Sequence, residues 1–295
     1  MPENTVALSK DSLLGGLREL GVKSGDVLMI HSAASSIGSI KELIKAPDTG
    51  MRWLLDAILE AVGPEGTIAV PTFTKTFKSE KDGPTGDVWD PKKSPSRVGS
   101  FTNYVWAQPN AARSDHPTHS VAAMGKRAAE FCAGHSWRDG ATTFDRRGPW
   151  GKLVDWKGKI LWIGTAMKTQ TAVHAVEEWM RLPYMATCVA LVDDRGQKRE
   201  VEVLQSPAGP RDFYRDGSKS EVAFGQAGIS RRGKVGKADC QLMDANRFIA
   251  WLWNALLVDP ALLLRDKEDD LWSAKAKADT AAHLKAFKGD WKQGA

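Results

Sequence analysis

The stretch that decides the fold is K-I-L-W-I-G-T-A-M-K-T-Q-T-A-V-H-A-V-E-E-W-M-R-L-P, residues 159–183. Its first six residues are mostly apolar and end on a glycine, a pattern that predicts a short buried strand. A loop over residues 165–170 follows. The remaining residues predict a helix that must stop at Pro183, because proline cannot donate the backbone hydrogen bond that continues a helix. Thr169 or Thr171 is placed to cap the start of this helix.

His174 falls in the first turn of that predicted helix. Thr171 lies three residues before it and Glu177 three residues after it, so the three side chains share one helix face. The positive end of the helix dipole disfavours a protonated imidazole, which predicts a neutral histidine able to act as a general base. A structural histidine beside a capping threonine fits the same pattern. The stretch alone does not separate these two interpretations.

Strands alternate with helices through the first two thirds of the chain, which is typical of an α/β sheet. Helices are predicted over residues 9–20, 51–62, 98–108, 126–132, 149–156 and 243–257. Strands are predicted over residues 27–30, 67–70, 159–164, 187–193 and 200–204. We expect one domain over residues 1–265, followed by a charged helical tail over residues 266–295.

Composition and charge exclude several classes of protein. The 295 residues are 42% apolar and carry a formal net charge of +5. No run approaches the roughly 20 apolar residues of a membrane span, and the first ten residues lack the features of a signal peptide. We therefore expect a cytoplasmic protein with no membrane partner and three free cysteine thiols. The basic segment 231–237 is too short to predict a nucleic-acid surface, and it could equally meet the phosphates of a cofactor.

The common catalytic motifs are absent. The sequence has no Walker loop, no G-x-G-x-x-G after a strand and no G-x-S-x-G elbow. His116 and His119 form H-x-x-H, but no third ligand lies near them in the sequence, so we predict no metal site. What remains is a set of loops at predicted strand ends, where open α/β sheets bind ligands: residues 31–38, 71–74, 113–120 and 165–171.

Several blocks of the sequence resemble, in order, the aminoglycoside 3-N-acetyltransferases, whose fold is distinct from that of the GNAT acetyltransferases. The blocks are L-R-E-L-G-V-K-S-G-D-V-L-M-I-H-S (17–32), G-P-E-G-T-I-A-V-P-T-F-T (63–74), W-D-P-K-K-S-P-S-R-V-G-S-F (89–101), R-S-D-H-P-T-H-S-V-A-A-M-G (113–125), P-W-G-K-L (149–153) and residues 160–177. The resemblance implies a mixed sheet flanked by helices. It also implies acetyl transfer from acetyl-CoA to an amine, classically the 3-amino group of a deoxystreptamine antibiotic, which confers resistance.

The same resemblance implies roles for individual residues. His174 matches the catalytic histidine, Glu177 the acid that follows it, and Thr171 a hydroxyl residue one turn earlier. The cofactor-binding residues that it implies are His31, Ser32, Ser35, Ser36, Gly38, Thr72, His119 and Ser120. The implied substrate-binding residues are Asp115, Glu178 and Asp212, and either Glu177 or Asp212 would orient the base. Donors for the developing oxyanion would come from backbone N–H groups or hydroxyls of the 31–36 or 118–120 loops.

The sequence departs from the family pattern at Lys168, where an acidic residue is often found. Three alternatives stay open: the same transfer to a different amine, thioester hydrolysis with water as acceptor, and a CoA-binding module without catalysis. The sequence also leaves open whether the chain forms a homodimer. A nucleic-acid partner is a fourth alternative and the weakest.

Overall fold

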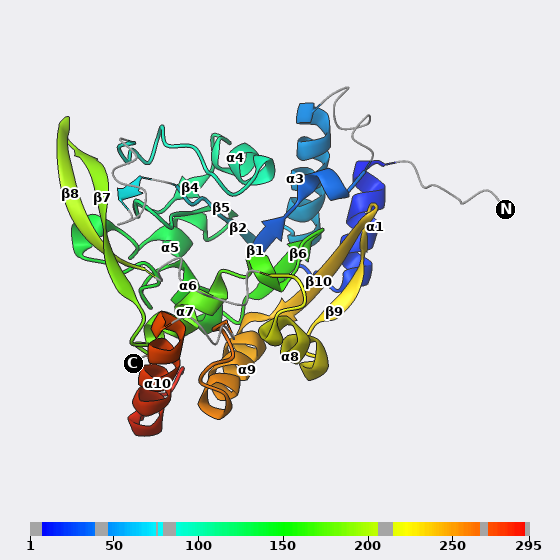
Figure 1. The fold of residues 1–295 in the computed structure, drawn as a ribbon. Coiled ribbons are helices and arrows are strands. Elements are labelled where there is room, and N and C mark those ends of the chain that lie inside the picture. Colours follow the sequence, from blue (N-terminus) through cyan, green and yellow to red (C-terminus); the bar gives the residue numbers. More distant parts are fainter. Residues whose placement is uncertain are drawn as a thin grey trace.

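The computed structural model describes residues 8–38, 47–74, 76–78, 87–205, 215–265 and 271–292. A seven-stranded mixed sheet, with strand order β4-β5-β2-β1-β6-β10-β9, forms its centre (Figure 1). β1 (Val27–Ser32), β2 (Thr67–Pro71) and β6 (Lys159–Ile163) are parallel to one another. The remaining neighbours are antiparallel. They are β4 (Ala112–Arg113), β5 (Val121–Gly125), β9 (Arg231–Val235) and β10 (Ala238–Asp244). The expected mixed sheet is therefore confirmed.

Helices cover both faces of this sheet, so its central strands are apolar on both sides. Successive residues of a strand point to opposite faces, and Leu28 accordingly packs with one cluster while Met29 packs with the other. The first face carries α1 (Lys10–Leu20), α3 (Pro47–Val62) and α4 (Ser100–Trp106). The second carries α5 (Ala128–Cys132), α6 (Pro149–Asp155), α7 (Ala172–Trp179) and α9 (Ala245–Val258).

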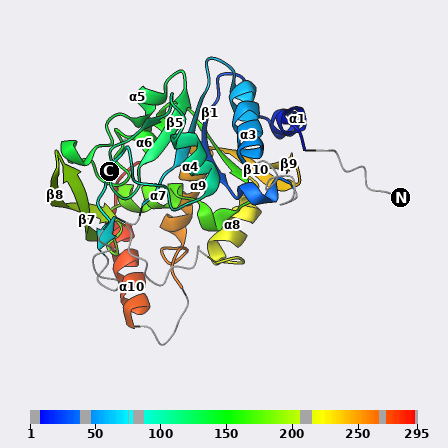
Figure 2. The same ribbon diagram turned by 90° about the horizontal axis from the view of Figure 1, so that it is seen from above.

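A second, three-stranded sheet lies on the side of the molecule opposite α1 (Figures 1 and 2). It consists of β3 (Phe77–Lys78), β7 (Ala186–Asp194) and β8 (Gln197–Gln205), all antiparallel. Short 3₁₀ turns, η1 (Ala34–Ser36), η2 (Trp137–Asp139) and η3 (Met167–Thr169), lie in the loops that connect the main sheet to its surroundings.

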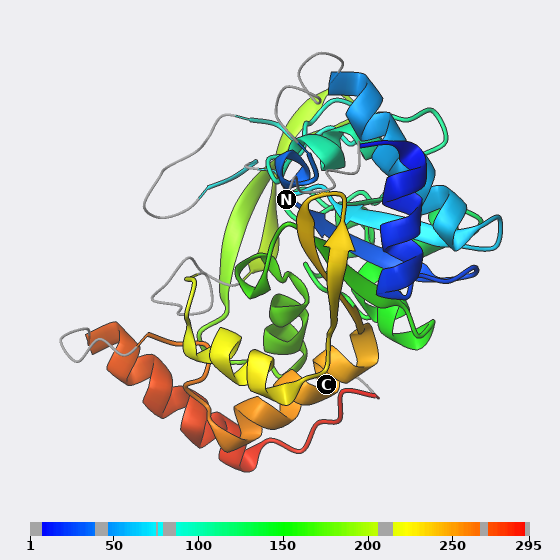
Figure 3. The same ribbon diagram turned by 90° about the vertical axis from the view of Figure 1, so that its right-hand side faces the viewer.

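The last helices gather at one end of the molecule, where α8 (Lys219–Ala227), α9 and α10 (Leu271–Ala286) lie together (Figure 3). The segment after residue 265 was expected to be helical, and α10 forms most of its described part. Leu284 joins the core cluster beneath α9, and His283 contacts the carbonyl of Met180 at 2.7 Å. The domain boundary at residue 265 stays a prediction.

The hairpin β9–β10 was not predicted. Residues 231–235 show no alternation of apolar side chains, since only Val235 is buried and the arginines lie exposed at the sheet edge. A basic edge strand of this kind blocks further strand pairing, and its sequence cannot be distinguished from that of a charged loop. No helix in the described part of the chain is both long and apolar enough to span a membrane.

Candidate active site

A cavity of about 400 Å³ opens where the parallel strands end. Its lining residues are His31, Ser32, Pro71, Phe73, Val98, Thr102, His119, Thr165, Lys168, Thr169, Gln170, Thr171 and His174. They come from the ends of β1, β2 and β6, from α4, from the loop before β5 and from the start of α7. Of the residues singled out in the sequence, the structure thus brings His31, Ser32, His119, Thr171 and His174 to one cavity.

His174 forms a hydrogen-bonded pair with a completely buried carboxylate. Its Nδ1 lies 2.6 Å from Oε2 of Glu177, one helical turn later, and the hydroxyl of Tyr184 donates to Oε1 of Glu177 at 2.8 Å. The carboxylate therefore fixes the imidazole through Nδ1, while the ring lines the cavity. A negative charge this close stabilises the imidazolium and opposes the influence of the helix N-terminus. This arrangement suits a base that gains a proton during a reaction.

The predicted threonine cap of α7 is wrong. The first residue outside the helix is Thr171, whose side chain makes no capping hydrogen bond. Oε1 of Gln170 instead accepts from the backbone N–H of Ala172 at 3.2 Å, and Thr169 donates to the carbonyl of Ala166. The Thr171 side chain is thereby left to line the cavity. The helix also ends at Trp179, four residues before Pro183.

Gly164 allows the sharp turn that leads from β6 into this loop. Its φ is +62°, and a Cβ there would lie 1.7 Å from Oγ of Ser36. Any side chain would push away η1, in which the Ser36 hydroxyl donates to the carbonyl of Ala33 at 2.6 Å. Ser36 thus packs behind the cavity wall, and Ser35 and Gly38 lie outside the lining set.

Two aromatic rings contact His119, which also lines the cavity. Its ring centroid lies 4.4 Å from that of Phe73 and 5.4 Å from that of Phe144, and Phe144 lies 5.8 Å from the ring of His174. The buried Phe144 ring therefore contacts both cavity histidines. Burial lowers the pKa of His119 well below its ordinary value, so this imidazole is neutral.

His31 and Ser32 present buried polar atoms that have no partner in the described part of the chain. These atoms are Nε2 of His31 and Oγ of Ser32. Burial lowers the pKa of His31 to about 4, which keeps the ring uncharged at neutral pH. Buried polar groups are nearly always hydrogen-bonded in native proteins. Two such atoms belong to residues that line the same cavity, which makes them candidate partners for a ligand.

Thr72 and Ser120 lie behind the wall, where they bind an arginine. Nε of Arg113 donates to the hydroxyls of both residues at 3.2 Å, and the two hydroxyls lie 2.8 Å apart. The guanidinium also stacks between Trp89 and Trp106, at 4.7 and 4.8 Å from their ring centroids. Burial lowers the pKa of Arg113 to about 10. A cofactor-binding role for the two hydroxyl residues stays a prediction; the structure shows them bracing the strand ends.

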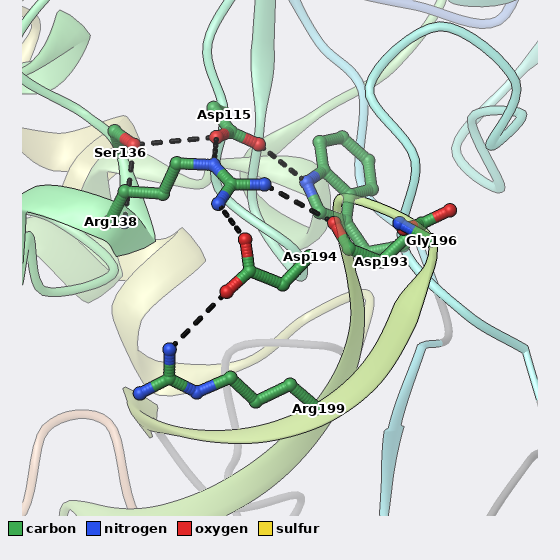
Figure 4. Close-up of polar contacts among 8 residues, drawn as sticks. Asp115, Ser136, Arg138, Asp193, Asp194, Gly196 and Arg199 are labelled. Carbon is green, nitrogen blue, oxygen red and sulfur yellow. Dashed lines mark hydrogen bonds and ion pairs between the residues drawn. The ribbon is translucent and has the colours of Figure 1, made fainter.

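The predicted substrate-binding acids lie outside the lining set. Asp115 accepts from the indole N–H of Trp89 at 2.8 Å and pairs with Arg138 at 3.3 Å, within an ion-pair cluster at the tip of β7–β8 (Figure 4). Glu178 accepts from the Thr142 hydroxyl and from the backbone N–H of Phe144. Asp212 lies outside the described residues. Their roles toward substrate stay predictions.

A family model described as aminoglycoside 3-N-acetyltransferase matches residues 29–256 of the chain. The chain belongs to the aminoglycoside 3-N-acetyltransferase family. Family membership makes it an acyltransferase. Aminoglycoside N(3)-acetyltransferase IX of Micromonospora chalcea is 30% identical over 265 residues, which cover 80% of this chain and 90% of that protein. Aminoglycoside N(3)-acetyltransferase VII of Streptomyces paromomycinus is 27% identical over 273 residues, with coverages of 83% and 91%.

Several solved structures share the fold of this family member. The apoenzyme of aminoglycoside acetyltransferase AAC(3)-IVa superposes with a TM-score of 0.76 at 22% identity, covering 94% of this chain and 99% of that one. Aminoglycoside acetyltransferase AAC(3)-Xa gives a TM-score of 0.72 at 25% identity, covering 88% and 95%. The YokD protein of Bacillus subtilis gives 0.70 at 22% identity, covering 84% and 99%.

In this acetyltransferase family member, the sequence analysis missed three residues of the site. Phe144 stands in a polar stretch that predicts a loop, yet its ring contacts both cavity histidines. Tyr184 follows Pro183 and reaches back to Glu177 only because the chain reverses after α7. Gln170 could have been found by allowing amide side chains, as well as threonine, to cap the helix.

Proposed function

We propose that the chain is an acetyl-CoA-dependent N-acetyltransferase that modifies the 3-amino group of an aminoglycoside and so confers resistance. The observation that carries the proposal is the His174–Glu177 pair on the wall of a cavity at the sheet's carboxyl edge. An alkylammonium first releases one proton to solvent. The neutral amine then loses a second proton as its nitrogen attacks a thioester, and a histidine held by a buried carboxylate can take that second proton.

The proposed reaction uses His174 twice. Its Nε2 accepts a proton from the substrate amine as the nitrogen attacks the carbonyl carbon of the acetyl thioester. The tetrahedral intermediate then collapses, the C–S bond breaks, and the proton passes from His174 to the departing CoA sulfur. Glu177 holds the ring in place and stabilises its charged form, and Tyr184 keeps the carboxylate oriented.

The cavity provides hydrogen-bonding groups suited to a pantetheine chain. That chain carries two amides, which can supply partners to Nε2 of His31 and Oγ of Ser32. Among the structural neighbours, AAC-IIIb has been solved as a binary complex with CoASH, and a mutant of AAC(3)-IVa in complex with a gentamicin and with apramycin. We place the protein in the cytoplasm, where acetyl-CoA is made and used.

The test follows CoA release from acetyl-CoA in the presence of a panel of aminoglycosides. We expect release that depends on the added antibiotic. His174→Ala should abolish transfer while sparing acetyl-CoA binding, and Glu177→Gln should lower kcat by about 10²–10⁴-fold, the range of general-base catalysis.

Other outcomes of the same assay would contradict the proposal. Release without any amine would favour thioester hydrolysis, and turnover on other amines alone would exclude the antibiotic as substrate. Acetyl-CoA binding without any turnover would favour a binding module. Full activity of His174→Ala would remove this residue from the role of base.

A further inference from the structure

Three histidines lie together behind and along one wall of the cavity. The rings of His116 and His135 are stacked, with centroids 4.6 Å apart and planes within 5°. His119, three residues after His116, lines the cavity itself. Burial lowers the pKa of all three, and that of His135 falls to about 4. Each ring is therefore neutral, with one nitrogen that donates and one that accepts.

The backbone fixes the tautomer of His116. The N–H of His119 donates to Nδ1 of His116 at 3.2 Å. An sp² ring nitrogen has a single lone pair in the plane of the ring, so Nδ1 of His116 is an acceptor and already occupied. The proton of this neutral ring therefore lies on Nε2.

The Thr118 hydroxyl then determines which ring nitrogen of His119 carries the proton. Its hydroxyl lies 2.9 Å from Nδ1 of His119 and 3.4 Å from Nδ1 of His116. Because the lone pair of His116 is already used, the Thr118 hydroxyl has its better acceptor in Nδ1 of His119. A ring that accepts at Nδ1 carries its proton on Nε2. His119 is thus a neutral imidazole with an N–H donor at Nε2, for which no hydrogen bond occurs in the described part of the chain.

We propose that the Nε2–H of His119 is an oxyanion donor that stabilises the tetrahedral intermediate of acetyl transfer. The proposal rests on the proposed function and adds a second catalytic histidine to it. His119 and His174 line the same cavity and both contact one aromatic ring, that of Phe144. Both rings line one cavity, in which His174 is assigned as the base and His119 as the oxyanion donor.

His174 and His119 have different roles in the acetyl-transfer step. As the amine nitrogen bonds to the carbonyl carbon, His174 takes the amine proton and the carbonyl π electrons move onto oxygen. Nε2–H of His119 donates to that oxygen, whose negative charge returns to form C=O when the C–S bond breaks. His119 gains and loses no proton in the cycle, which is why a neutral donor that resists protonation suits the position.

The test compares two replacements of His119 of similar size. His119→Leu removes the donor and should lower kcat by about 10²–10³-fold, the usual effect of losing one oxyanion donor. His119→Gln carries an amide N–H near the place of Nε2 and should recover part of that loss. Thr118→Val removes the hydroxyl that fixes the tautomer of His119. It should therefore lose more activity than Thr118→Ser, which keeps the hydroxyl.

A spectroscopic measurement separates catalysis from structure. The carbonyl stretch of acetyl-CoA labelled with ¹³C at the carbonyl carbon should lie at lower frequency when bound to the wild-type protein than in water. It should move back toward the solution value in His119→Leu but not in His119→Gln. An unshifted stretch in the wild type, or equal stretches in the wild type and the leucine variant, would overturn the proposal even if activity fell.

Different outcomes would contradict the proposed function and the donor role of His119. Without acetyl-CoA binding by the wild-type chain, both proposals are wrong. With binding, a His119-dependent stretch and no transfer to any aminoglycoside, the donor role stands and the antibiotic substrate is excluded.

Discussion

Lys168 is the lining residue that is least suited to a polycationic substrate, because it places a positive charge in the cavity. Among the lining residues that the structure describes, it supplies an ammonium group, and none supplies a carboxylate. Its Nζ lies 2.8 Å from Oδ2 of Asp216, a pair in which both side chains are substantially exposed. An aminoglycoside entering beside this pair meets the lysine as a like charge and as a competitor for Asp216.

Lys168→Glu is therefore expected to lower the KM for an aminoglycoside, with little change in the KM for acetyl-CoA. Exposed charge pairs contribute about 0.2–1 kcal/mol, which corresponds to a change of up to about fivefold. The effect should shrink in high salt, because ions screen exposed charges. Steady-state kinetics at two salt concentrations check it.

Lys198→Glu on β8 is the matched control, since it makes the same change of charge at an exposed position outside the lining set. Equal effects of the two variants would indicate a bulk charge effect. A higher KM for acetyl-CoA in Lys168→Gln would instead place Lys168 against the phosphates of the cofactor.

At the scale of elements, Glu178 joins α7 to the segment before α6. Its carboxyl group accepts from the Thr142 hydroxyl and from the backbone N–H of Phe144 at 3.1 Å. Glu178 follows Glu177 directly, so two neighbouring acids serve different sides of α7. One orients His174, and the other positions the Phe144 ring that contacts both cavity histidines.

Burial raises the pKa of Glu178 from 4.5 to about 7. The folded protein therefore keeps this proton up to about pH 7, whereas the unfolded chain loses it near pH 4.5. The free energy of unfolding should fall as pH rises through this window, by on the order of 3 kcal/mol from this group. Glu178→Gln cannot ionise and should lack this part of the pH dependence.

Urea unfolding between pH 4.5 and pH 8 measures this difference, with the exposed Glu202→Gln on β8 as the control. The stability of Glu178→Gln relative to wild type should increase with pH, and that of Glu202→Gln should stay constant. Parallel pH profiles for Glu178→Gln and wild type would show that Glu178 ionises normally in the folded state.

At the scale of the whole molecule, α10 packs as part of the main core. Leu284 and Ala276 are buried in the cluster that also contains α7 and α9, and Phe287 packs against Trp253 with ring centroids 5.6 Å apart. His283 bonds to the carbonyl of Met180, which directly follows α7. The C-terminal helix therefore supports the helix that carries the proposed base.

Leu284→Ala is expected to lower the free energy of unfolding by about 2–5 kcal/mol, the usual cost of truncating a buried leucine. The neighbouring Lys285→Ala removes an exposed side chain and should have little effect. Chemical denaturation followed by circular dichroism checks both. A single shifted transition would make α10 part of the cooperative unit, whereas unchanged stability would support residues 1–265 as a domain that folds without the tail.

The sequence by itself determined the local parts of this protein. A run of apolar residues, a glycine and a proline were enough to predict the strand, loop and helix of residues 159–183. The spacing of His174 and Glu177 was enough to place both on one helix face, because neighbours three apart on a helix touch whatever surrounds them. The ordered blocks of the chain also indicated the family that the comparison confirms.

Only the tertiary structure decided how distant segments complete the site. Tyr184 reaches Glu177, Phe144 reaches both histidines, and Arg113 occupies the hydroxyls of Thr72 and Ser120. Asp115 forms an ion pair with Arg138, and the charged segment β9 is a strand because it pairs with β10. The physical reason is common to all of them: hydrogen-bond partners and ring contacts between segments far apart in the chain depend on how those segments pack, and residue spacing encodes only contacts within one element.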